Sequence, residues 1–160
     1  MKTLLANPHV VLLVRVFVGL LFVVSSVDKI ADPAAFAQSI TNYQILPGWS
    51  TMALATTLPW LELLCGFAVM FGVFERGGSL VLSVLLTVFT LAVISGLVRG
   101  LDISCGCFTQ DPHAGRIGWM KVLENTALLG LTLFLLFSET NSFSVSRYMQ
   151  DTALPQDRPQ

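Results

Sequence analysis

Two cysteines separated by one glycine are the residues of this chain best suited to chemistry. Cys105 and Cys107 flank Gly106, so their Cα atoms lie roughly 5–7 Å apart, which overlaps the separation that a disulfide accepts. Glycine permits the bend that so small a ring needs. The ring closes almost no loop, so the bond would add little stability and would be easily reduced. The pattern therefore favours thiol–disulfide exchange over structural cross-linking.

Other interpretations of this pair stay open. Cys105, Cys107 and His113 together offer two thiolates and an imidazole to a soft or borderline metal ion, although no fourth ligand is evident. The two cysteines could also simply pack at the edge of a membrane. In favour of exchange, the reactive thiolate would be stabilised by Arg99, Arg116, Lys121 and the start of the following helix.

The composition points to a membrane environment. The 160-residue chain is 54% hydrophobic and only 12% charged, far more apolar than an ordinary globular domain. Its net charge of -1 gives no indication of nucleic acid binding. The partners that fit are the lipid bilayer, small molecules and proteins that exchange thiols.

Four apolar segments are long enough to cross a bilayer as helices, which takes roughly 20 residues each. They cover about residues 10–27, 50–74, 78–98 and 117–138. The first thirty residues resemble a signal peptide, but Arg15 interrupts the apolar run, so we expect an uncleaved span. The chain is thus predicted to be an all-α polytopic membrane protein. Residues 1–138 would form a four-transmembrane-helix antiparallel bundle, and residues 139–160 a polar, disordered tail.

Two of the connections carry structure of their own. Asp32-Pro33 is typical of a helix start and predicts a short interfacial helix between spans one and two. Phe36, Ile40 and Tyr43 would share one face of it, turned to the membrane surface or to the mouth of the bundle. Glu75–Gly78 predicts a tight polar hairpin between spans two and three.

Charged residues inside the spans are functional candidates by default. Arg15 in the first span and Glu62 in the second lie at comparable depth, so they are predicted to form an intramembrane ion pair; a proton or quinone role is the alternative. Near the opposite end, Lys29, Lys121 and Glu124 are expected to gather below the cysteines. There they would tune the thiols or simply neutralise helix ends.

The orientation follows from the cysteines. Four spans place both termini on one side and the Cys-Gly-Cys segment on the other. Basic residues divide five to four between these sides, so the positive-inside rule gives little guidance. A disulfide-forming pair is most useful where disulfides persist, so we expect it to face the periplasm from a bacterial inner membrane, with both termini cytoplasmic. Cys65, deep in the second span, is expected only to pack.

The order and spacing of these features resemble the MauE family of methylamine-utilisation proteins, within the broader DoxX-like group of four-helix membrane proteins. The positions that carry the resemblance are Arg15, Gly19, Phe22, Ser25, Lys29, Asp32-Pro33, Phe36, Ile40, Tyr43, Leu46-Pro47, Pro59, Glu62, Gly66, Cys105-Gly106-Cys107-Phe108, Ile117-Gly118-Trp119 and Glu124-Asn125. One position departs from the pattern: Thr109 follows Phe108 where the family often has glycine.

The resemblance implies an integral membrane accessory protein that supports maturation of an exported, disulfide-containing protein together with a thioredoxin-like partner. In the family context that client is the small subunit of methylamine dehydrogenase. Cys105 and Cys107 would then act as a thiol–disulfide oxidoreductase pair. The alternatives are a non-catalytic membrane scaffold and a DoxX-type subunit of a sulfur or thiol oxidoreductase, which would need quinone as its cofactor.

Overall fold

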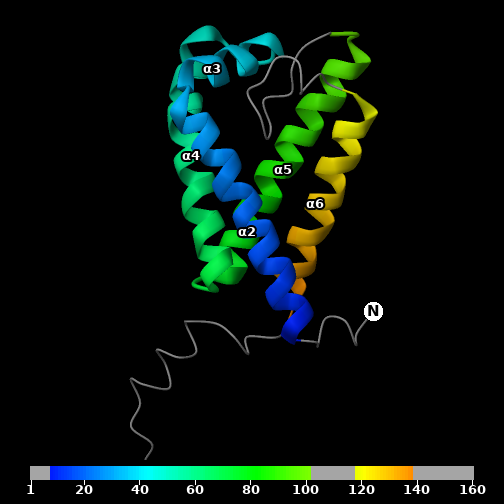
Figure 1. Cartoon of the computed structure of the whole chain (residues 1–160). Helices are drawn as coiled ribbons and strands as arrows, with labels where there is room; N and C mark the ends of the chain where they lie inside the picture. The colour runs from blue at the N-terminus through cyan, green and yellow to red at the C-terminus, as the bar shows by residue number, and fades with distance from the viewer. Residues whose placement is uncertain (1–7, 102–117, 139–160) are drawn as a thin grey trace, which may run out of the picture.

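A computed structural model gives the structure of residues 8–101 and 118–138. These residues form five α-helices and no strand: α2 (Pro8–Ala31), α3 (Pro33–Asn42), α4 (Gly48–Phe71), α5 (Glu75–Val98) and α6 (Trp119–Phe137). Four of the helices are long and apolar enough to cross a membrane. The predicted all-α architecture of four spans with a short helix between the first two is confirmed (Figure 1). The expected C-terminal tail lies outside the described residues.

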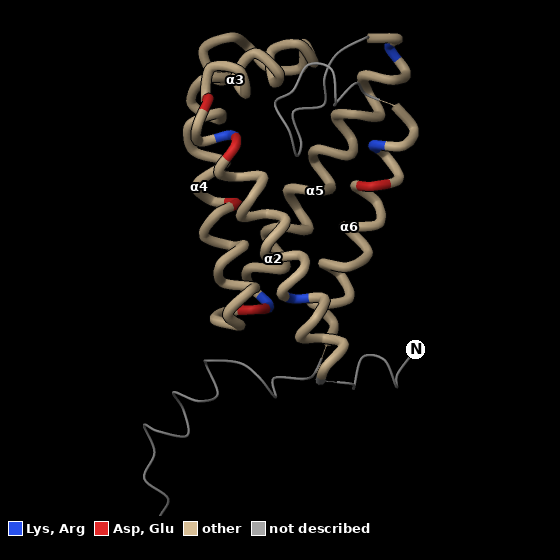
Figure 2. Tube along the Cα trace, viewed as in Figure 1, with Lys and Arg blue, Asp and Glu red and all other residues tan. Residues whose placement is uncertain are grey.

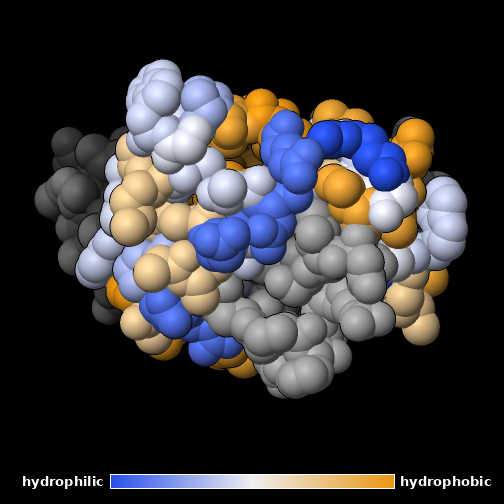
Figure 3. All heavy atoms as spheres, turned by 90° about the horizontal axis from the view of Figure 1, so that it is seen from above, coloured by the Kyte–Doolittle hydropathy of each residue, from blue (hydrophilic) through white to orange (hydrophobic). Residues whose placement is uncertain are grey.

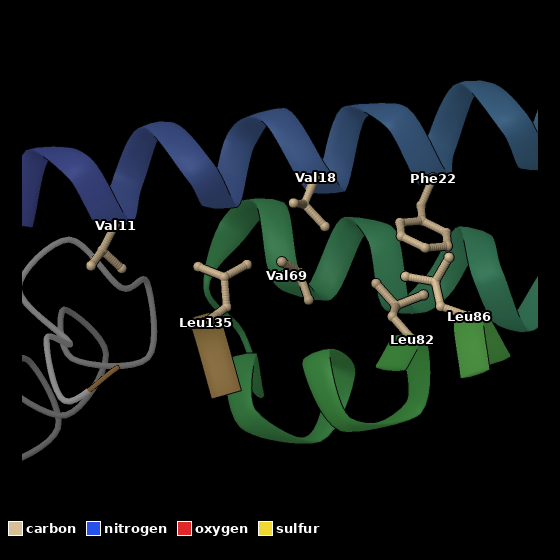
Figure 4. Packing of buried hydrophobic residues seen from close by; sticks show 7 residues of the cluster. All are labelled: Val11, Val18, Phe22, Val69, Leu82, Leu86 and Leu135. Atoms are coloured by element: carbon tan, nitrogen blue, oxygen red, sulfur yellow. The ribbon is translucent and has the colours of Figure 1, made fainter. Parts of the chain in front are cut away.

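The four long helices are arranged as two antiparallel pairs. α2 packs along α4, and α5 packs along α6. The two pairs lie close together at the end where α2 begins, and they diverge toward the end that carries α3 (Figure 1). The main apolar core lies where the pairs meet, with Val18 and Phe22 of α2 facing Val69 of α4 and Leu82 and Leu86 of α5 (Figure 4).

Small and polar residues bring the helices together. A Cβ atom at Gly19 would lie 2.7 Å from the Cβ of Met70 and 2.8 Å from the carbonyl oxygen of Gly66, so only glycine allows α2 and α4 to approach this closely. A hydrogen bond of 2.9 Å between the hydroxyls of Ser83 and Thr132 joins α5 to α6. Close contact and interhelical hydrogen bonds hold membrane helices together, because lipid offers no hydrophobic driving force.

The turn between α4 and α5 is not where the sequence predicts it. Glu75–Gly78, expected to form the hairpin, is instead the first turn of α5. The chain turns at Gly72–Phe74, because Gly72 takes a left-handed φ of 70° and its N–H closes α4 on the carbonyl of Val69. Spans two and three therefore end and begin three residues earlier than expected, at Phe71 and Glu75.

α3 forms as predicted and covers the diverging end of the bundle. The carboxylate of Asp32 caps it by accepting a hydrogen bond of 2.9 Å from the N–H of Ala35, and Pro33 is its first residue. Phe36 and Tyr43 are buried on its inner face, against apolar residues of α4 and α5. Seen from this end, hydrophilic side chains gather in several patches between apolar ones (Figure 3).

Candidate functional site

A buried ion pair lies between α2 and α4 near the end that α3 covers. The Nζ atom of Lys29 is 2.6 Å from Oε2 of Glu62, and the two side chains are only 2% and 1% exposed. The ammonium also lies over the rings of Phe36 in α3 and Phe89 in α5, at 5.1 and 5.2 Å from their centroids. Each such cation–π contact at a desolvated site is worth about 2 kcal/mol or more. Lys29 thereby connects α2 with three other helices.

The predicted ion pair between Arg15 and Glu62 is wrong. Glu62 pairs with Lys29, and Nη1 of Arg15 lies 3.4 Å from Oε2 of Glu75 at the first residue of α5. The glycine contact between α2 and α4 sets Arg15 level with the end of α4, roughly 15 Å along the axis from Glu62. Side chains lean toward the N-terminus of their helix, so Lys29, about four turns beyond Arg15 along α2, reaches back to Glu62 instead.

The charged residues of the described part of the chain lie toward the α3 end of the bundle or toward the opposite end (Figure 2). The pair of Arg15 and Glu75 joins α2 to α5 at the end remote from α3, where its side chains are 4% and 10% exposed. α2 thus carries a buried cation in each half, and each meets a carboxylate from a different helix. Buried charges of this kind are tolerated in a membrane only when they are paired.

The expected cluster of Lys29, Lys121 and Glu124 is not formed. Lys121 and Glu124 pair with each other along α6, with Nζ and Oε2 2.8 Å apart and side chains 20% and 46% exposed. Lys29 is held by Glu62 inside the bundle. The structure therefore separates one predicted group into two ion pairs, and Lys29 acts as a clamp that holds α2 to α4. Tuning of the thiols by these residues stays a prediction, because the cysteines lie outside the described residues.

Arg99, at the end of α5, fastens the C-terminal end of α3. Its guanidinium donates hydrogen bonds to the carbonyl oxygen of Tyr43 at 2.8 Å and to the side-chain oxygen of Gln44 at 3.3 Å. Burial raises the pKa of Tyr43 to about 12, so its phenol stays neutral. Sequence reasoning noted Arg99 only as a residue that could favour the thiolate and did not predict its contact with the end of α3. It missed Phe89, because an aromatic residue among apolar ones carries no distinguishing signal.

Cys105, Cys107 and Arg116 lie outside the described residues, as does His113. The chain leaves α5 through Leu101 and enters α6 through Gly118, both at the end that carries α3 (Figure 1). Within residues 8–101 and 118–138, Cys65 is a free thiol packed against the apolar core, as expected. The same residues contain no group of three His, Cys, Asp or Glu side chains that could hold a metal ion.

Comparison with known proteins identifies the family. Residues 7–138 match the family model described as methylamine utilisation protein MauE. The chain belongs to the MauE family. The MauE match includes all five helices and the segment that holds Cys105 and Cys107.

Individual MauE relatives are similar over most of their length. The protein named methylamine utilization protein MauE from Methylophilus methylotrophus is 30% identical over 136 residues, which is 84% of this chain and 72% of the relative. The MauE protein of Paracoccus denitrificans is 28% identical over 134 residues, 83% of this chain and 72% of the relative. That of Methylorubrum extorquens is 29% identical over 126 residues, 78% and 67% of the two chains. No solved structure matches the chain significantly.

Proposed function

We propose that this MauE-family protein is a membrane accessory factor in methylamine metabolism, and that it supports maturation of an exported disulfide-containing protein by thiol–disulfide exchange at Cys105 and Cys107. Its redox partner would be a thioredoxin-like protein. The observation that carries the proposal is topological. Both helix ends that flank the cysteine segment, Leu101 and Gly118, lie at the bundle end that α3, Arg99 and the Lys29 clamp hold in place.

We expect Cys105 and Cys107 to carry out the exchange without the third cysteine, Cys65. Cys65 lies 17 residues into α4, about 25 Å along the axis from the α3 end. Cys105 is four residues and Cys107 six residues beyond Leu101, so even an extended chain carries them at most roughly 14 and 21 Å from it. Cys105 therefore cannot reach Cys65, and Cys107 could do so only if the chain were fully extended straight along the bundle, so we expect Cys105 and Cys107 to serve each other.

The exchange needs no external oxidant. One thiolate of the reduced pair attacks a disulfide of the partner, forming a mixed disulfide and releasing the partner's other sulfur as a thiolate. The second cysteine then attacks the mixed disulfide, which leaves Cys105–Cys107 oxidised and the partner reduced; the reverse sequence transfers the disulfide outward. The N-terminus of α6 supports thiolate formation, because no described side chain caps it and its first turn contains no acidic residue.

Trapping the mixed disulfide tests the proposal. Cys107 is closer in sequence to Arg116 and to the start of α6, so we expect it to attack and Cys105 to resolve. Cys105→Ser should then accumulate a covalent complex with a thioredoxin-like protein. The complex would be seen on non-reducing gels and would disappear with reductant.

Two further variants make the trapping experiment decisive. Cys107→Ser should trap nothing, and Cys65→Ser should behave as the parent protein because its thiol is partly buried against the bundle core. If no single variant traps a partner and the double variant still supports client maturation, exchange at this pair is wrong and a scaffolding role takes its place.

We further propose that the α3 end faces the periplasm of a bacterial inner membrane and that both termini are cytoplasmic, because disulfides persist on the outer side. In intact cells treated with a permeant reductant, a membrane-impermeant maleimide should label Cys105 and Cys107. Alkaline phosphatase fused after Gln160 should be inactive. An active fusion, or cysteines that become labelled only after the membrane is opened, would reverse this orientation.

A further inference from the structure

A groove of about 390 Å³ runs between α2 and α6. Phe17 and Leu21 of α2 line one wall, and Ala127, Leu128 and Leu131 of α6 line the other. Phe17 is 49% exposed, so the groove opens on the side of the bundle that meets lipid. Its apolar walls suit a hydrocarbon chain.

One residue of the lining is polar. Glu124 lies at this groove although α6 is a membrane-spanning helix, and its side chain is 46% exposed. It is five residues from Trp119, the first residue of α6, which corresponds to about 7–8 Å along the helix axis. A glutamate side chain leans toward the N-terminus of its helix, so the carboxylate sits at the boundary between the hydrocarbon and the headgroup layer.

Glu124 borders the groove mainly through its apolar stem, and its carboxylate and the ammonium of Lys121 place two charges of opposite sign beside the groove at headgroup depth. Lys121 is one turn nearer the helix start and pairs with Glu124 at 2.8 Å, while both side chains keep part of their surface exposed. A ligand that complements this arrangement needs a cation that donates hydrogen bonds to Glu124, an anion that accepts from Lys121, and a hydrocarbon chain for the groove.

We propose that the α2–α6 groove is a binding site for one phospholipid with a primary ammonium headgroup, such as phosphatidylethanolamine. One acyl chain lies between Phe17 and Leu128, the ammonium donates to the carboxylate of Glu124, and the phosphate accepts from Lys121. A choline headgroup carries the same charges but has no N–H to donate. A glycerol headgroup leaves a net negative lipid beside Glu124. Discrimination among these three lipids is the signature of the site.

Native mass spectrometry of the delipidated full-length protein in detergent measures this discrimination directly. Phosphatidylethanolamine, phosphatidylcholine and phosphatidylglycerol with identical acyl chains are titrated separately. The first should bind about tenfold more tightly than the second, the difference expected for a charge-assisted hydrogen bond. Glu124→Gln should remove that preference and leave the affinity for phosphatidylcholine within about twofold.

A matched pair of alanine replacements tests the groove itself. Ala127→Leu narrows the groove and should lower binding of every lipid at the site, whereas Ala53→Leu, at an exposed alanine of α4 that does not line the groove, should leave binding unchanged. Equal affinity for the three lipids, a preference for phosphatidylglycerol, or equal losses from the two alanine replacements would each overturn the proposal. Circular dichroism of all variants excludes loss of fold as the cause.

Discussion

Replacing Lys29 by methionine should lower the free energy of unfolding in detergent by about 3–5 kcal/mol, because it leaves Glu62 as an unpaired charge inside the bundle. Glu62→Leu should cost a similar amount, since it leaves the ammonium buried 2.6 Å from the position of its lost partner. The Lys29→Met, Glu62→Leu double variant should recover most of the loss, because a buried pair replaced by apolar residues of similar size is often neutral.

The exposed pair on α6 provides the control for this cycle. Lys121→Met and Glu124→Leu remove an ion pair of similar length, 2.8 Å against 2.6 Å, whose side chains are 20% and 46% exposed, and each change should cost less than about 1 kcal/mol. Thermal or denaturant unfolding of the five variants measures the effects. Additive losses at Lys29 and Glu62 would show that the two side chains do not stabilise each other.

Gly19→Leu should destabilise the protein by about 3 kcal/mol, because the new side chain must force α2 away from α4. A Cβ atom at this position already meets the backbone oxygen of Gly66 at 2.8 Å, and a backbone atom cannot move aside without shifting the helix. The displacement should also lengthen the distance between Lys29 and Glu62, because this ion pair and the Gly19 contact both join α2 to α4. Unfolding in detergent and the protein yield from membranes measure the loss.

Gly130→Leu is the matched control for that change. Gly130 also lies within a membrane-spanning helix, but a Cβ atom there has no neighbour within 4 Å. The added side chain should project into lipid and leave stability unchanged or slightly improved, because leucine favours a helix more than glycine does. Equal losses at the two glycines would contradict the close approach of α2 and α4.

The sequence predicts well the features that depend on local chemistry. The four spans follow from the length of apolar runs, which the bilayer thickness dictates. α3 follows from Asp32 and Pro33, whose cap and ring act on their immediate neighbours. The buried side of α3 follows from the helical spacing of Phe36 and Tyr43.

Features that depend on how helices align could not be predicted in the same way. Arg15 and Glu62 were predicted to pair because they lie at comparable depths in their spans. The register of α2 against α4, however, is set by the contact at Gly19, which no local sequence pattern reveals. The turn was misplaced for a related reason. The pair Gly77–Gly78 looks like a breaker, yet the helix ends at Gly72, where the backbone itself becomes left-handed.

Lys29 and Arg15 of α2 pair with residues that come much later in the sequence, and this affects how the chain is inserted during synthesis. The partner of Lys29 comes 33 residues later in the chain and that of Arg15 comes 60 residues later. At a synthesis rate of about 5–20 residues per second, α2 exists without its counter-ions for roughly 2–7 s and 3–12 s respectively. During that time neither cation can be left in lipid at low cost. The insertion machinery must therefore keep α2 out of the lipid until α4 has emerged, and then until the first residue of α5 has emerged.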